Sequence, residues 1–107
     1  MAKIIWTEPA LSDLKGVAEY IALDKLDAAK RFVNNTFLIV DRLEKFPDSG
    51  RKPPELKRSR YKEVIVNPCR IFYRFDKKND KVYIIFVMRS EMKLRKYMID
   101  ERGKEYS

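Results

Sequence analysis

Residues 61–76 constrain the fold of this chain more than any other segment. They hold two β-favouring runs joined by the turn pair Asn67-Pro68, a pattern that predicts a β-hairpin. Successive side chains of a strand point to opposite faces. In the second strand, one face therefore carries Arg70, Phe72 and Arg74. The other face carries Ile71, Tyr73 and Phe75. We expect the apolar face to pack a core and the arginine-bearing face to stay open for a polyanion.

Two amphipathic helices are predicted before this hairpin. The first begins at the candidate N-cap Thr7, has Pro9 in its first turn, and runs to about residue 23. After a break at residues 24–27, a second helical pattern continues to Pro47. The short break predicts an antiparallel α-hairpin whose two apolar stripes face the same sheet. The stripes are Leu11, Leu14, Val17, Ala18 and Ile21, then Ala29, Phe32, Val33, Phe37, Val40, Leu43 and Phe46.

The remaining segments complete an α+β fold. Residues 3–6 and 82–88 favour strands, residues 51–60 predict an extended connector, and a short helix is expected from Glu91 onward. The order β-α-α-β-β-β plus a short C-terminal helix predicts a small antiparallel sheet with the α-hairpin packed on one face. We expect one domain over residues 1–107, with a core at 1–98 and a frayed charged tail at 99–107.

The charge distribution points to an acidic partner. Residues 1–50 carry seven Lys or Arg against eight Asp or Glu, whereas residues 51–107 carry seventeen against eight. A field concentrated in one half suits nucleic acid, an anionic lipid surface or an acidic protein, although a solvated lysine-rich surface has the same composition. The absence of a long apolar run or a secretory leader favours the cytoplasm and no membrane partner.

The missing residue types exclude several chemistries. With no histidine and one cysteine, Cys69, the chain has no His-based zinc site, no Ser-His-Asp triad and no Cys-His pair. We expect no metal and no cofactor. We expect Cys69, which lies inside the hairpin, to be a packing residue.

Several pieces together resemble the RelE/ParE superfamily of toxins from bacterial type II toxin-antitoxin, or plasmid stabilisation, modules, and the ParE-like branch most closely. The resemblance covers residues 3–98. It is carried by Trp6-Thr7 with Ala10, Asp13-Leu14, Tyr20-Ile21, Ala28-Ala29, Leu43 with Phe46-Pro47, Gly50-Arg51, the run Tyr61 to Val66, and Arg70-Ile71-Phe72-Tyr73. It implies a growth-inhibiting toxin held inactive by a cognate acidic antitoxin, with which it forms a hetero-oligomer.

The resemblance to RelE-like members implies a metal-independent endoribonuclease that cuts messenger RNA on the ribosome. Its catalytic set would be Arg70, with Glu63 as a general base and Arg89 and Tyr97 near the C-terminus. The match is partial, because second-strand positions that carry lysines in such enzymes hold Tyr61 and Glu63 here. A cross-strand ion pair between Arg70 and Glu63 is the structural alternative for these two residues.

The resemblance to ParE-like members implies instead a poison of DNA gyrase, with no hydrolytic centre. It draws on the helix segment Asp13-Leu14-Lys15-Gly16 and the exit from Met88 to Leu94. A third alternative is an inactive member that only binds an antitoxin. The predicted target-binding residues are Arg51, Arg58, Arg60, Arg70, Arg74, Arg89 and Arg95, and the predicted antitoxin-binding residues are Phe72, Met88, Met92 and Met98.

Overall fold

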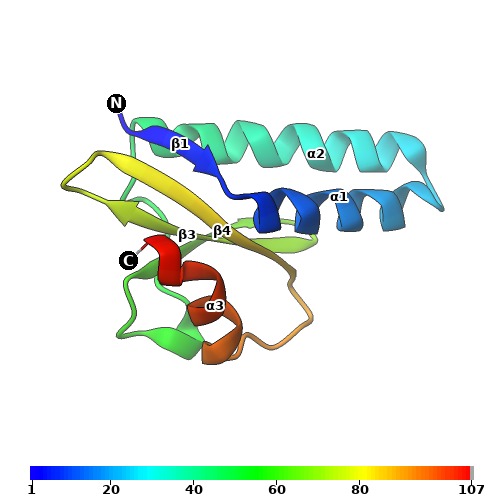
Figure 1. The fold of residues 1–107 in the computed structure, drawn as a ribbon. Helices are drawn as coiled ribbons and strands as arrows, with labels where there is room; N and C mark the ends of the chain where they lie inside the picture. Colours follow the sequence, from blue (N-terminus) through cyan, green and yellow to red (C-terminus); the bar gives the residue numbers. More distant parts are fainter. Residues whose placement is uncertain (107) are drawn as a thin grey trace.

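Four strands form one sheet in the computed structural model, which describes residues 1–106 (Figure 1). The strands are β1 (Lys3–Trp6), β2 (Tyr61–Val66), β3 (Cys69–Asp76) and β4 (Lys81–Arg89), in the spatial order β1-β4-β3-β2. β2, β3 and β4 pair antiparallel in succession, as predicted, but β1 pairs with β4 in parallel. The expected antiparallel sheet is thus mixed. The two helices carry the chain from β1 to β2 at the opposite edge, and the two hairpins that follow place β4 beside β1. Parallel neighbours need a long connection of this kind.

The hairpin predicted at residues 61–76 is confirmed. β2 pairs with β3 along its whole length, from Tyr61 opposite Arg74 to Val66 opposite Cys69. The pairing of β3 with β4 shifts by one residue, since Phe72 lies opposite Phe86 while Tyr73 lies opposite Ile84. The extra residue, Ile85, is a β-bulge, and a bulge locally bends a strand.

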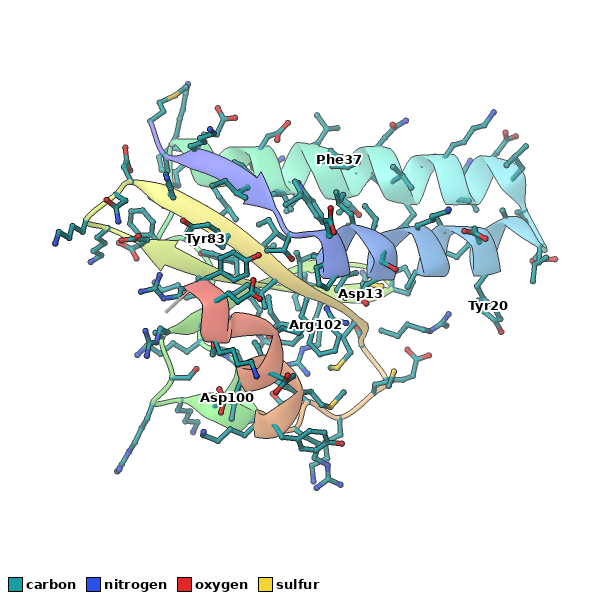
Figure 2. All side chains as sticks on the ribbon, viewed as in Figure 1. Asp13, Tyr20, Phe37, Tyr83, Asp100 and Arg102 are labelled. Carbon is teal, nitrogen blue, oxygen red and sulfur yellow. The ribbon has the colours of Figure 1, made fainter. Side chains whose placement is uncertain are left out.

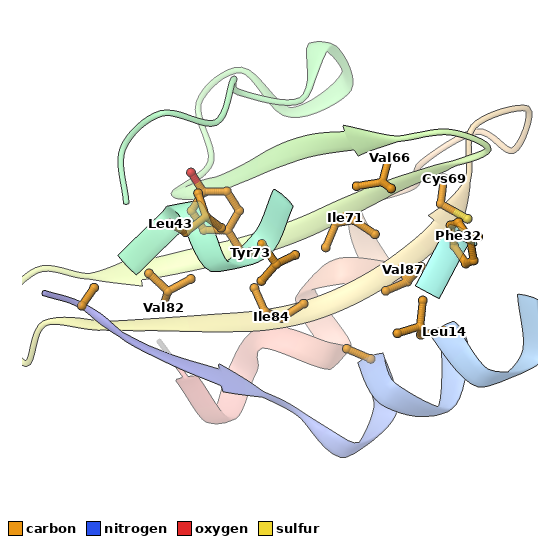
Figure 3. Packing of buried hydrophobic residues seen from close by; sticks show 13 residues of the cluster. Leu14, Phe32, Leu43, Val66, Cys69, Ile71, Tyr73, Val82, Ile84 and Val87 are labelled. Carbon is orange, nitrogen blue, oxygen red and sulfur yellow. The ribbon is translucent and has the colours of Figure 1, made fainter. Parts of the chain in front are cut away.

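The two predicted helices are α1 (Glu8–Ala22) and α2 (Leu26–Asp41), the latter extended by a 3₁₀ turn at Arg42–Glu44. Thr7 caps α1, since its hydroxyl accepts a hydrogen bond from the N–H of Ala10. Both helices cover one face of the sheet, where Leu14 and Phe32 lie beside Val87 in a core that also contains Ile84 (Figure 3). Two residues of the predicted stripes are instead exposed, Leu11 by 41% and Phe46 by 63%.

The opposite face of the sheet is covered rather than open, which corrects the expectation from the sequence. Helix α3 (Lys96–Gly103) lies across it (Figure 1), and Ile99 packs with Phe72 and Phe86 in a second core. The C-terminal helix therefore starts later than expected and includes residues expected to fray. A 3₁₀ turn follows at Lys104–Tyr106; Ser107, the last residue of the predicted tail, lies outside the described residues.

An ion pair joins the two helical layers at the edge of β4 beyond β1. Arg102 of α3 donates from both terminal nitrogens to the carboxylate of Asp13 on α1, over 2.8 and 2.9 Å. Figure 2 shows the two side chains directed toward each other. Asp13 also accepts from the N–H of Val87, and Arg102 donates to the carbonyl of Ile85. The pair thereby satisfies backbone groups of β4 that β1 is too short to reach.

The connector at residues 51–60 is less extended than predicted. It contains a 3₁₀ turn at Pro54–Leu56. Before that turn, the backbone N–H and C=O of Arg51 each bond to the backbone of Glu63, so the connector shields part of the free edge of β2. No helix within residues 1–106 is long and apolar enough to cross a membrane.

Candidate functional site

A buried cluster of charges occupies the position predicted to be catalytic. Arg70, which is 7% exposed, donates from Nε to Glu63 and from its two terminal nitrogens to Glu55, each over 2.7 Å. The side chain of Glu63 is inaccessible to solvent and also accepts from Nε of Arg51 over 2.7 Å. The ion pair offered as the structural alternative is therefore present, within a larger network.

The network balances charges that would be costly to bury alone. Two guanidinium groups and two carboxylates meet, and each oxygen of Glu63 receives its own donor. An isolated buried charge costs several kcal/mol, and good geometry with complete hydrogen bonding offsets that cost. Because the Arg70 guanidinium donates to both glutamates, its charge is already neutralised and is poorly placed to meet a phosphate.

The acidity of Glu55 gives a test of this network in solution. Its hydrogen bonds from Arg70 lower the pKa of the Glu55 carboxyl to about 2. A carboxyl whose pKa is depressed in the folded state stabilises the fold above its unfolded pKa, and that contribution is lost as pH falls through the folded pKa. Glu55→Gln should therefore weaken the loss of stability between about pH 4.5 and pH 2.

Urea unfolding followed by circular dichroism across this pH range measures the effect. Glu8→Gln, which alters an exposed carboxylate in the first turn of α1, is the matched control. We expect the Glu55 variant to show the flatter profile and the lower stability at neutral pH. Identical profiles for the two variants would contradict the proposed role of the Arg70 contact.

The other two members of the predicted catalytic set lie apart from this network. Arg89 at the end of β4 pairs with Glu91, and its guanidinium lies over the ring of Tyr20, 5.1 Å from the centroid. Tyr97 is 74% exposed on α3. No hydrogen bond or ion pair within residues 1–106 joins either residue to Arg70 or Glu63.

A groove of about 690 Å³ runs between α1 and the end of β4. Met88 is buried at its wall, whereas Met92 is 49% exposed. Of the predicted antitoxin-binding residues, these two line the groove. Phe72 is fully buried and Met98 half-buried in the core beneath α3. The groove is also lined by Ser12, Asp13, Gly16, Val17, Tyr20, Phe86, Val87, Arg89 and Glu91.

The predicted target-binding arginines do not all lie on one surface. Arg70 is buried, Arg51 contacts Glu63, and Arg74 is half-buried on β3 with an Nε that lacks a hydrogen-bond partner in the described part of the chain. Arg58, Arg60 and Arg95 are exposed. Within residues 1–106, no group of three or more His, Cys, Asp or Glu side chains is placed to hold a metal ion.

The sequence did not indicate three features of the structure. They are the contact of Glu55 with Arg70, the place of Tyr20 in the groove, and the ion pair of Asp13 with Arg102. The two members of that pair are 89 residues apart in the chain, and no local pattern links residues at such a distance. Cys69 is fully buried in the core. Burial raises the pKa of its thiol to about 11, which leaves little thiolate at neutral pH.

Comparison with known proteins identifies the family. The model of the ParE toxin of the type II toxin-antitoxin system parDE matches residues 4–94. The chain belongs to the ParE toxin family. A solved structure described as the chromosomal ParDE toxin-antitoxin system from P. aeruginosa is similar to this ParE-family chain, with a TM-score of 0.69 and 20% identity. The match covers 85% of this chain and 98% of the other, and at that identity it shows the shared fold. No curated protein matches the chain.

Proposed function

We propose that this ParE-family toxin poisons DNA gyrase in the cytoplasm and is neutralised by a cognate acidic antitoxin. The observation that supports a non-hydrolytic action is that the Arg70 side chain is buried and paired with two carboxylates. Its guanidinium donates to Glu63 and Glu55, and phosphoryl chemistry on RNA needs a cation free to stabilise the extra negative charge of the transition state. Within the predicted catalytic set, Arg89 and Tyr97 do not converge on Arg70 to replace it.

The groove between α1 and β4 supports the antitoxin half of the proposal. It joins apolar surface from Val17 and Met92 to Arg89, which is paired with the exposed Glu91. An amphipathic acidic segment would find an apolar docking surface there and would compete with Glu91 for the guanidinium. Tyr20, which is 63% exposed, adds an aromatic side chain of the kind enriched in protein interfaces.

The test compares two targets side by side. Purified toxin is added to DNA gyrase with plasmid, scored for supercoiling and for cleaved plasmid, and to a ribosome-programmed messenger-cleavage reaction. We expect trapped cleaved plasmid, intact message, and recovery of supercoiling when the product of the neighbouring short reading frame is added. Cleaved message with normal supercoiling would overturn the proposal in favour of the ribonuclease. Inactivity in both reactions would overturn it in favour of an antitoxin-binding member alone.

A further inference from the structure

Two basic segments far apart in the chain lie side by side on the surface. The connector at residues 52–60 and the entry to α3 at residues 93–97 together carry seven Lys or Arg against a single carboxylate, Glu55. A hollow of about 450 Å³ is lined by Lys57 and Arg58 of the connector and by Lys96 of α3. The pKa of Glu55 is lowered chiefly by Arg70 and slightly by the backbone N–H of Leu94, which places the two segments in contact.

The internal acids leave most of these cations unpaired. Glu55 is held by Arg70, and Lys96 pairs with Asp100. The other exposed cations of the two segments form no ion pair with any residue of the described chain. Of these six cations, Lys57 and Arg58 line the hollow, and Lys52 begins the connector. We call Lys57, Arg58, Arg60, Lys93 and Arg95 the basic hollow. Elsewhere in the described residues, Lys62, Arg89 and Arg102 have carboxylate partners, whereas Lys25, Lys30 and Arg31 have none.

We propose that the basic hollow binds the phosphate backbone of duplex DNA directly. Five exposed cations on two adjacent segments match a ligand that presents regularly spaced negative charges and needs no deep pocket. An acidic peptide fits less well, because stable peptide docking needs apolar anchors. The one large exposed apolar side chain in residues 52–60 and 93–97 is Tyr97. The apolar groove described above lies instead between α1 and β4.

This inference deepens the proposed function, since it names the part of a gyrase–DNA complex that the toxin would touch. It rests on the proposed function only for the choice of DNA. DNA binding can be measured without gyrase, so the two proposals fail separately. A toxin that binds DNA but does not poison gyrase would overturn only the proposed function. A toxin that poisons gyrase but does not bind DNA would overturn only the proposal for the basic hollow.

The experiment measures binding of the purified toxin to a short labelled DNA duplex by fluorescence anisotropy at a series of KCl concentrations. If all five cations contact phosphates, the slope of log affinity against log salt should be about −4.5. The triple variant Lys57→Ala, Arg58→Ala, Arg60→Ala should reduce the slope to about −2 and weaken binding roughly 100-fold at physiological salt.

The matched control removes the same charge from the far end of the molecule. Lys25→Ala, Lys30→Ala, Arg31→Ala alters exposed residues at the start of α2 (Figure 1) and should leave the slope unchanged. Circular dichroism melting verifies that both variants fold. Equal losses in the two variants would overturn the proposal by showing that net charge alone drives binding. A second result would also overturn the proposal: the toxin fails to bind DNA, and the triple variant at Lys57, Arg58 and Arg60 loses affinity for the antitoxin.

Discussion

Replacing Arg70 with alanine should lower the free energy of unfolding by about 3 kcal/mol, because it leaves the inaccessible carboxylate of Glu63 without its buried partner. The remaining partner, Arg51, has a side chain that is 59% exposed, so it compensates only in part. Chemical denaturation at neutral pH measures the loss. Arg89→Ala is the matched control, because it breaks an ion pair near the surface, and such pairs contribute little to stability.

The double variant Arg70→Met, Glu63→Leu separates charge from packing. It removes both buried charges and leaves Glu55, whose side chain is 26% exposed, to solvent. Replacing a buried ion pair with apolar residues of similar volume is often neutral or stabilising, so the double variant should be more stable than Arg70→Ala. A stable Arg70→Ala protein that had lost messenger cleavage would contradict the structural role and restore the catalytic one.

Gly50→Ala should destabilise the fold by about 3 kcal/mol, because there is no room for a methyl group. A Cβ at this position would lie 2.5 Å from the hydroxyl oxygen of Tyr73 and 2.8 Å from the carbonyl oxygen of Glu63. Tyr73 is fully buried and cannot swing aside. Its hydroxyl also accepts from the N–H of Gly50 and donates to the carbonyl of Pro47.

The matched substitution Gly16→Ala should have the opposite sign. A Cβ at Gly16 in α1 meets no atom within 4 Å, and alanine within an exposed helix is favoured over glycine by about 1 kcal/mol. Thermal melting of the two variants under identical conditions compares them directly. Equal shifts in melting temperature would contradict the close approach of Tyr73 to Gly50.

Local patterns were enough to predict the hairpin, the two N-terminal helices and their shared core face. Each depends on neighbours in sequence: the cap at Thr7, the apolar repeat through Leu14, and the strand alternation around Ile71. The parallel pairing of β1 with β4 was not predictable in this way, because nothing near Lys3 signals which distant strand it will join. Helix α3 was predicted, but its bounds and its position over the sheet were not, since it has no clear apolar stripe.

The role of Arg70 was even less predictable from local sequence patterns than the fold. Alternation along β3 correctly placed Arg70 and Phe72 on one face, but whether that face is open depends on α3 and on Glu55 from the connector. An arginine that binds phosphate and one that neutralises buried carboxylates have the same sequence signature. Only the positions of Glu55 and Glu63 in the fold separate them.

The pairing of β1 with β4 also governs when the molecule can fold. Lys3 lies opposite Lys81 and Trp6 opposite Ile84, so the first strand made has no partner until the last strand has been synthesised. Contacts of such long sequence separation slow folding. A chain that stops before β4 lacks Val82, Ile84 and Val87, the buried side chains of that strand that pack with the α-hairpin. Translation must therefore pass β4 before the toxin fold can form, and products that end before β4 should not reach that fold.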